Sequence, residues 1–143
     1  MSTHRRALGR GRLVAAAGAI VVLVGCVLPW FRVGGDGGLP ALSGNAFEGT
    51  GILVFLAALA TLALVALPYA AGDHPVAIER WWAYAALAVL AVAGLLVRVA
   101  GIVGDAGAIE AILPDRAPGL WLSAAGVLGL AVAASDMFGS RER

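Results

Sequence analysis

Apolar residues occur in four long, almost uncharged blocks, which are separated by segments rich in glycine, proline and charge. A helix of about twenty residues, rising about 1.5 Å per residue, crosses the hydrocarbon core of a bilayer. The blocks do not alternate between apolar and polar positions, as the strands of a membrane barrel do. The pattern predicts four membrane-spanning helices, at residues 13–30, 51–70, 81–103 and 119–138.

The segments between and around the spans are short. Residues 1–12 are a basic tail, and residues 139–143 are a second tail after the last span. Short connections place consecutive helices side by side and antiparallel. We therefore expect residues 13–138 to form one all-α membrane domain, an antiparallel bundle of four transmembrane helices.

The composition excludes a soluble protein. Of the 143 residues, 61% are hydrophobic and 13% charged, and the mean hydropathy is +0.92. Soluble domains are about half apolar and a quarter charged. The formal net charge of +1 provides no basic surface for nucleic acid, so the lipid bilayer is the first partner that the composition predicts.

The arginines predict the orientation, because basic residues gather in the cytoplasmic loops of membrane proteins. With both tails on one side, the basic residues on that side are Arg5, Arg6, Arg10, Arg12, Arg80, Arg141 and Arg143. The other side has Arg32 and Arg116. We expect a multi-pass protein of the cell membrane with both termini in the cytoplasm.

Tryptophans at the ends of the spans agree with that orientation, because indole rings favour the headgroup level of a bilayer. Trp30 and Trp121 lie at the outer ends of the first and fourth spans, and Trp81 and Trp82 lie at the inner end of the third. We interpret all four as interface anchors.

The two outer loops differ in character. Residues 31–50 contain six glycines, typical of turns or a loose cap, and no alternating pattern supports a two-strand hairpin. Residues 108–113 are mostly apolar and predict one helical turn at the membrane surface or over the mouth of the bundle.

Small residues at helical spacing predict where the spans touch, because close packing of small residues drives helix association in lipid. The recurring positions are Gly11, Gly18 and Gly25 in the first span, Gly94 and Gly101 in the third, and Ala125, Gly129 and Ala133 in the fourth.

Arg98 is the only basic residue inside a span. It shares a helix face with Gly94 and Gly101, so we expect it to face neighbouring helices rather than lipid. It could bind an anionic ligand or line a permeation path. It also lies about five residues from the outer end of its span, within reach of snorkelling to the interface. Its candidate ion-pair partners are Asp36, Glu48, Asp105 and Glu110.

Cys26 is the single cysteine, so no intramolecular disulfide can form. Residues 23–26 match the pattern that precedes a lipid-modified cysteine, which would make Cys26 the first residue of a processed lipoprotein. However, the residues after Cys26 continue the apolar span, and we favour a small buried packing residue.

Apart from Arg98 and Cys26, the sequence offers no candidate catalytic, cofactor-binding or metal-binding residue. His4 and His74 lie outside the spans, and we see no catalytic Ser/His/Asp set, metal-ligand spacing or pair of mid-membrane carboxylates. We therefore expect no enzymatic activity, no cofactor and no metal.

Three short motifs are Leu28-Pro29-Trp30 at the outer end of the first span, Ser43-Gly44 before the second, and Pro118-Gly119-Leu120-Trp121-Leu122, which opens the fourth. With them, the chain resembles small bacterial four-span membrane proteins of unknown function. The resemblance implies the four-span architecture and no activity or binding residue.

Two functions therefore remain open. The first is a non-enzymatic accessory or scaffolding subunit whose spans pack on a membrane-protein partner or on copies of itself. The second is a small oligomeric transporter or channel with Arg98 as an anion contact.

Overall fold

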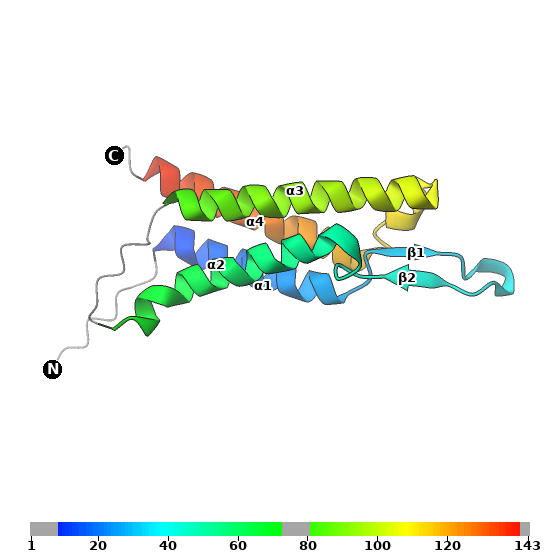
Figure 1. Ribbon diagram of the computed structural model, residues 1–143, viewed down its shortest axis with the longest axis horizontal. Coiled ribbons are helices and arrows are strands. Elements are labelled where there is room, and N and C mark those ends of the chain that lie inside the picture. Colours follow the sequence, from blue (N-terminus) through cyan, green and yellow to red (C-terminus); the bar gives the residue numbers. More distant parts are fainter. Residues whose placement is uncertain (1–8, 73–80, 141–143) are drawn as a thin grey trace.

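The computed structural model describes residues 9–72 and 81–140. Its four long helices lie side by side along the long axis of the molecule (Figure 1) and are α1 (Arg10–Val27), α2 (Ile52–Ala70), α3 (Trp81–Ala106) and α4 (Pro118–Gly139). Each helical segment is long and apolar enough to cross a membrane. The predicted all-α bundle is therefore confirmed. The tails predicted at residues 1–12 and 139–143 lie partly outside the described residues.

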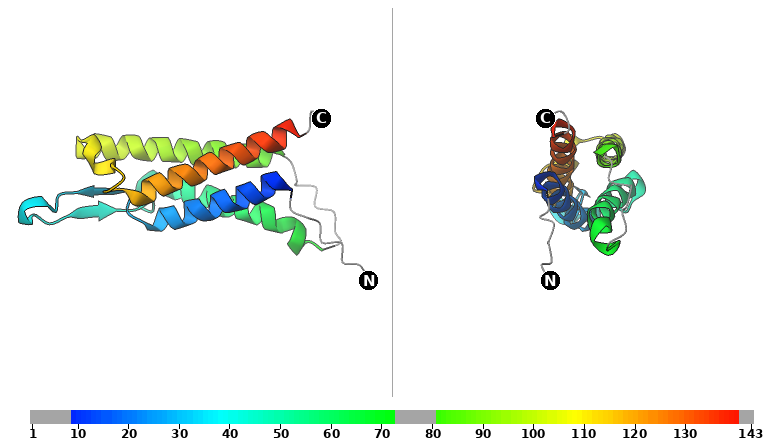
Figure 2. Two further views of the ribbon diagram at one scale, coloured as in Figure 1. Left: turned by 180° about the vertical axis from the view of Figure 1, so that it is seen from behind. Right: turned by 90° about the vertical axis from the view of Figure 1, so that its left-hand side faces the viewer.

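The helices form a ring in which α1 and α3 each contact both α2 and α4 (Figure 2). The most extensive contact joins α1 and α4. We call the end of the bundle where α1 begins and α4 ends the tail end, and the opposite end the hairpin end.

Glycines let the backbones of α1 and α4 approach each other closely. A Cβ atom added to Gly18 would lie 3.0 Å from the carbonyl oxygen of Gly126, and one added to Gly126 would lie 2.7 Å from the carbonyl oxygen of Gly18. Towards the hairpin end, Gly25 lies against Gly119 and Ser123. Such close approach is how helices associate in lipid. The seam predicted on α1 is confirmed.

The prediction for α4 was right for two positions and wrong for the third. A Cβ atom on Gly129 would lie 3.4 Å from Cα of Gly18, and Ala133 lies against Gly11, whereas Ala125 is exposed. The closest approach to α1 is at Gly119 and Gly126, seven residues apart, which the sequence did not predict. Because the partner positions on α1 also recur every seven residues, an antiparallel partner meets the same helix face at that spacing.

The prediction for α3 was right for one glycine and wrong for the other. A Cβ atom on Gly94 would lie 3.1 Å from Cβ of Leu53 on α2. Gly101 is exposed, and a Cβ atom there would meet nothing within 4 Å. Gly101 therefore lies on an outward face of α3 rather than on its seam with α2.

The first loop forms a β-hairpin, which the sequence did not predict. Strand β1 (Phe31–Val33) pairs antiparallel with β2 (Leu42–Gly44), with Arg32 opposite Ser43. A 3₁₀ turn, η1 (Asp36–Gly38), lies in the tip, and the hairpin projects beyond the helices (Figure 1). Glycines 34, 35, 37 and 38 all have positive φ angles, which suit glycine and allow the chain to reverse.

Two further 3₁₀ turns complete the hairpin end. Turn η2 (Gly49–Gly51) leads into α2, and turn η3 (Ile109–Ile112) lies between α3 and α4. The helical turn predicted for residues 108–113 is thus confirmed.

Candidate functional site

The candidate site lies at the hairpin end, where α1 stops three residues earlier than the predicted span. Pro29 has no N–H group, so the carbonyl of Gly25 cannot receive the usual helical hydrogen bond from the residue four positions later. The indole Nε1 of Trp30 donates to that carbonyl instead, at 3.0 Å. The backbone N–H of Ala46 donates to the next carbonyl, that of Cys26, at 3.3 Å. The end of α1 is therefore capped by a side chain and by the loop that follows the hairpin.

The same short segment is bonded to the hairpin and to α4. The backbone N–H of Trp30 donates to the carbonyl of Gly44 at 2.7 Å. The N–H of Gly119 donates to the carbonyl of Pro29 at 2.9 Å and so satisfies a free donor in the first turn of α4. A Cβ atom on Gly119 would lie 2.5 Å from the carbonyl oxygen of Leu28, which leaves no room for a side chain. Three segments distant in sequence meet here, and we call this meeting point the Pro29–Trp30 junction.

Trp30 is the residue that departs most from its predicted place. Its side chain is fully buried, with 0% exposure, so its ring is not at the lipid surface where an interface anchor would lie. The ring packs in the core instead. The indole N–H finds its acceptor inside the protein.

The other three tryptophans are accessible to different extents. Trp121 is 52% exposed and donates through Nε1 to the carbonyl of Ile112 at 2.8 Å, while Trp82 at the tail end is 55% exposed. Trp81 is partly buried and contacts the edge of Phe138, with 5.0 Å between ring centroids. These positions suit a bilayer interface at both ends of the bundle.

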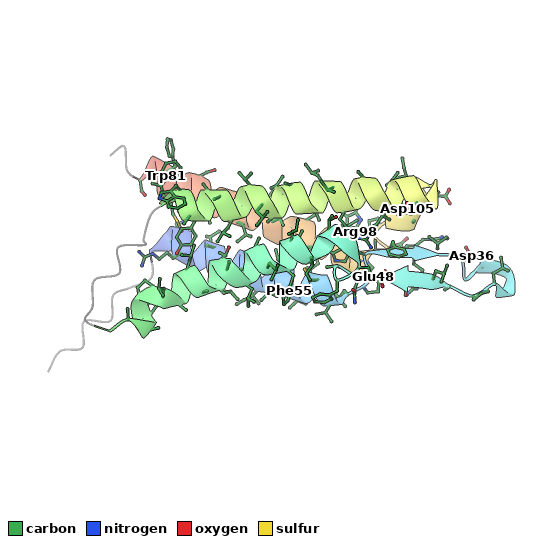
Figure 3. All side chains as sticks on the ribbon, viewed as in Figure 1. Asp36, Glu48, Phe55, Trp81, Arg98 and Asp105 are labelled. Atoms are coloured by element: carbon green, nitrogen blue, oxygen red, sulfur yellow. The ribbon has the colours of Figure 1, made fainter. Side chains whose placement is uncertain are left out.

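Arg98 lies between α3 and the base of the hairpin (Figure 3). Its guanidinium carbon is 5.8 Å from the centre of the Phe31 ring, a cation–π distance. A Cβ atom on Gly49 would lie 3.1 Å from Nη1 of Arg98, so the glycine leaves space for the guanidinium. The side chain faces the protein, as expected, but the residues beside it belong to the hairpin and to η2 rather than to the neighbouring helices.

The charged partners proposed for Arg98 are not in contact with it. Among the described residues, no carboxylate lies within 4.0 Å of its guanidinium, and its buried Nε has no hydrogen-bond partner. Figure 3 shows Glu48 nearby, while Asp105 and Glu110 are exposed.

An ion pair that the sequence did not reveal links the two loops of this end. Nη2 of Arg116 is 3.1 Å from Oδ2 of Asp36, which joins the second loop to the tip of the hairpin. The only sequence signal was that opposite charges stand in two loops on the same side of the bundle. The pair is solvent-exposed and contributes little to stability.

Cys26 is fully buried in the core beside the Pro29–Trp30 junction. That placement agrees with a packing residue and leaves the thiol inaccessible in the folded protein. Residues 9–72 and 81–140 contain no group of three or more His, Cys, Asp or Glu side chains that could hold a metal ion.

No protein family, no curated protein and no solved structure matches this chain. The geometry of the bundle is therefore the basis of the functional argument.

Proposed function

We propose that this chain is a non-enzymatic accessory or scaffolding subunit of the cell membrane, with both termini in the cytoplasm and the hairpin outside. The observation that carries the proposal is the hairpin, which projects beyond the helices (Figure 1) and leaves apolar side chains uncovered. Leu39 and Leu42 are each 69% exposed, and Val33 is also exposed.

The hairpin is anchored to the bundle at its base, where the carbonyl of Gly44 accepts a hydrogen bond from the backbone N–H of Trp30. The exposed ion pair between Asp36 and Arg116 adds a weaker contact from the tip to the second loop. Apolar side chains that stay uncovered on an extramembrane segment are typical of a protein-binding surface. An anchored hairpin can present that surface at little entropic cost, because its conformation is already set.

The interior of the bundle favours a scaffold over a transporter. Its fully buried polar side chains, within the described residues, are Thr61 and Ser123. The Thr61 hydroxyl donates to the carbonyl of Ala57 in its own helix. Transport of a polar solute needs polar groups or charges along a path through the membrane. The alternative function, an oligomeric transporter that uses Arg98 as an anion contact, is supported by the unpartnered Nε of that residue.

The partner surface can be tested by affinity purification in mild detergent. We expect wild-type protein to recover one stoichiometric partner, and the double variant Leu39→Ser, Leu42→Ser to recover at least about tenfold less, since hot-spot side chains dominate binding. Leu113→Ser is the matched control, because Leu113 is an exposed leucine in the other loop of the same end. Equal recovery by the hairpin variant and the control would refute the proposal.

A flux assay distinguishes the alternative function. Purified protein in vesicles is expected to give no anion flux above protein-free vesicles. Flux that the variant Arg98→Ala abolishes would replace the scaffold with the transporter.

The proposed orientation predicts a labelling pattern in intact cells. In a Cys26→Ala background, a membrane-impermeant maleimide should label Leu39→Cys without permeabilisation and Ser140→Cys only after it. Both positions are exposed, so accessibility does not limit the reaction. Labelling of the two positions under the same condition would contradict the orientation.

A further inference from the structure

A cavity of about 860 Å³ opens at the tail end, between the beginning of α1, the beginning of α3 and the end of α4. Its lining carries both charge and aromatic surface, and includes Arg10, Arg12, Trp81, Ser135 and Asp136. This volume is in the range of small-molecule binding sites, about 300–1,000 Å³. Trp81 contacts Phe138 across the α3–α4 pair and so adds aromatic rings at the edge of the cavity.

A second hollow, an apolar groove of about 390 Å³, runs along α3 and α4. Alanines form much of its floor, among them Ala85 and Ala88 on α3 and Ala131 and Ala134 on α4. Val92 and Leu96 extend it towards the middle of α3. Polar atoms are nearly missing from this lining, so the groove suits a hydrocarbon chain rather than a polar ligand.

The cavity and the groove lie next to each other along shared faces of α3 and α4. Trp81 lines the cavity and Ala85, four residues later, lines the groove. On α4, Ser135 lines the cavity and Ala131, four residues earlier, lines the groove. Residues four apart lie on one face of a helix. A charged hollow at the helix ends is therefore followed, one helical turn further along the same faces, by an apolar one.

We propose that these two hollows bind one anionic phospholipid, with its headgroup phosphate in the cavity and an acyl chain in the α3–α4 groove. Among the described residues that line the cavity, two are arginines, Arg10 and Arg12, and one is an acid, Asp136, so this lining favours an anion. Arginine binds phosphate oxygens through charge-assisted hydrogen bonds. The site goes beyond the proposed scaffold function and does not depend on it, because it lies at the opposite end from the hairpin.

A phospholipid fits this pair of hollows better than a free phosphate ion does. A free ion would use the cavity and leave the apolar groove without a role. A lipid occupies both, because its headgroup and acyl chain are covalently joined in the same order as the two hollows.

The test is native mass spectrometry of the full chain released from nanodiscs of phosphatidylcholine with added phosphatidylglycerol. We expect wild-type protein to retain one phosphatidylglycerol molecule, and the double variant Arg10→Gln, Arg12→Gln to retain at least about tenfold less, since two charged hydrogen bonds are lost. Arg32→Gln is the charge control, an exposed arginine at the hairpin end. It should retain as much lipid as wild type.

The groove is tested separately, so that misfolding of the arginine variant cannot decide the result. Ala131→Leu fills the groove and should also lower retention, whereas Ala125→Leu, at an exposed position of α4 outside the groove, should not. Three results would overturn the proposal: equal retention of phosphatidylcholine and phosphatidylglycerol, equal loss in test and control variants, or displacement of the lipid by glycerol phosphate. The last would show a site for a soluble phosphate.

Discussion

Replacement of Gly126 by alanine is expected to force α1 and α4 apart and to lower the free energy of unfolding by about 3 kcal/mol, the upper part of the usual range for overpacking. The added methyl group would lie 2.6 Å from Cγ2 of Val22 and 2.7 Å from the carbonyl oxygen of Gly18. A side chain can move aside, but a helix backbone moves only together with its helix. The cost therefore falls on the most extensive contact in the bundle.

Gly129→Ala is the matched control, one turn away on the same helix. Its methyl group would lie 3.4 Å from Cα of Gly18, an ordinary contact. Alanine also favours helix over glycine by about 1 kcal/mol, so this variant should be neutral or more stable. Unfolding in detergent by titration with sodium dodecyl sulfate, followed by circular dichroism, measures both. If the two variants unfold alike, the glycine seam is not what joins α1 to α4.

The second large effect is expected at Trp30. Trp30→Ala should cost about 3–5 kcal/mol, because it removes a fully buried indole from the core. Trp30→Phe keeps most of the apolar volume but leaves the carbonyl of Gly25 without a donor, since Pro29 has none to offer. A buried polar group left unpaired costs about 1–3 kcal/mol, so we expect about 2 kcal/mol for the phenylalanine variant.

Trp121→Phe is the control that distinguishes the loss of a buried hydrogen bond from the loss of any indole N–H group. Trp121 also donates to a backbone carbonyl, that of Ile112, but its side chain is half exposed. Water can replace the lost donor there, so the cost should stay below about 1 kcal/mol. The same unfolding titration applies, and a Trp30→Phe variant as stable as Trp121→Phe would refute the capping role of the indole.

The four helices could be predicted because each corresponds to one continuous apolar block. The positions of their ends were harder to predict, as Trp30 shows. A tryptophan at the edge of an apolar block fits an interface anchor equally well, and only the absent N–H of Pro29 distinguishes the two cases. Without that N–H group, the carbonyl of Gly25 accepts from Trp30, and the same segment is bonded to Gly44 and Gly119. The sequence alone does not show that these three glycines lie together.

The hairpin could not be predicted, because strands of three residues are too short to display alternation. Its register depends on the bond from Trp30 to Gly44 and on a glycine-rich tip. The seam on α4 was predicted only in part for a related reason. A helix composed largely of alanine, glycine and leucine offers several regular spacings, and the partner helix selects the one that is used.

The order of the helices along the chain gives the α1–α4 contact a consequence for biogenesis. These are the first and the last of the four helices to be synthesised, yet they are the pair that packs most closely. Under the proposed membrane topology, the glycine face of α1 has only lipid against it until α4 is inserted. The ring would then close late in assembly, and a nascent chain stalled before α4 would expose an unmatched helix surface.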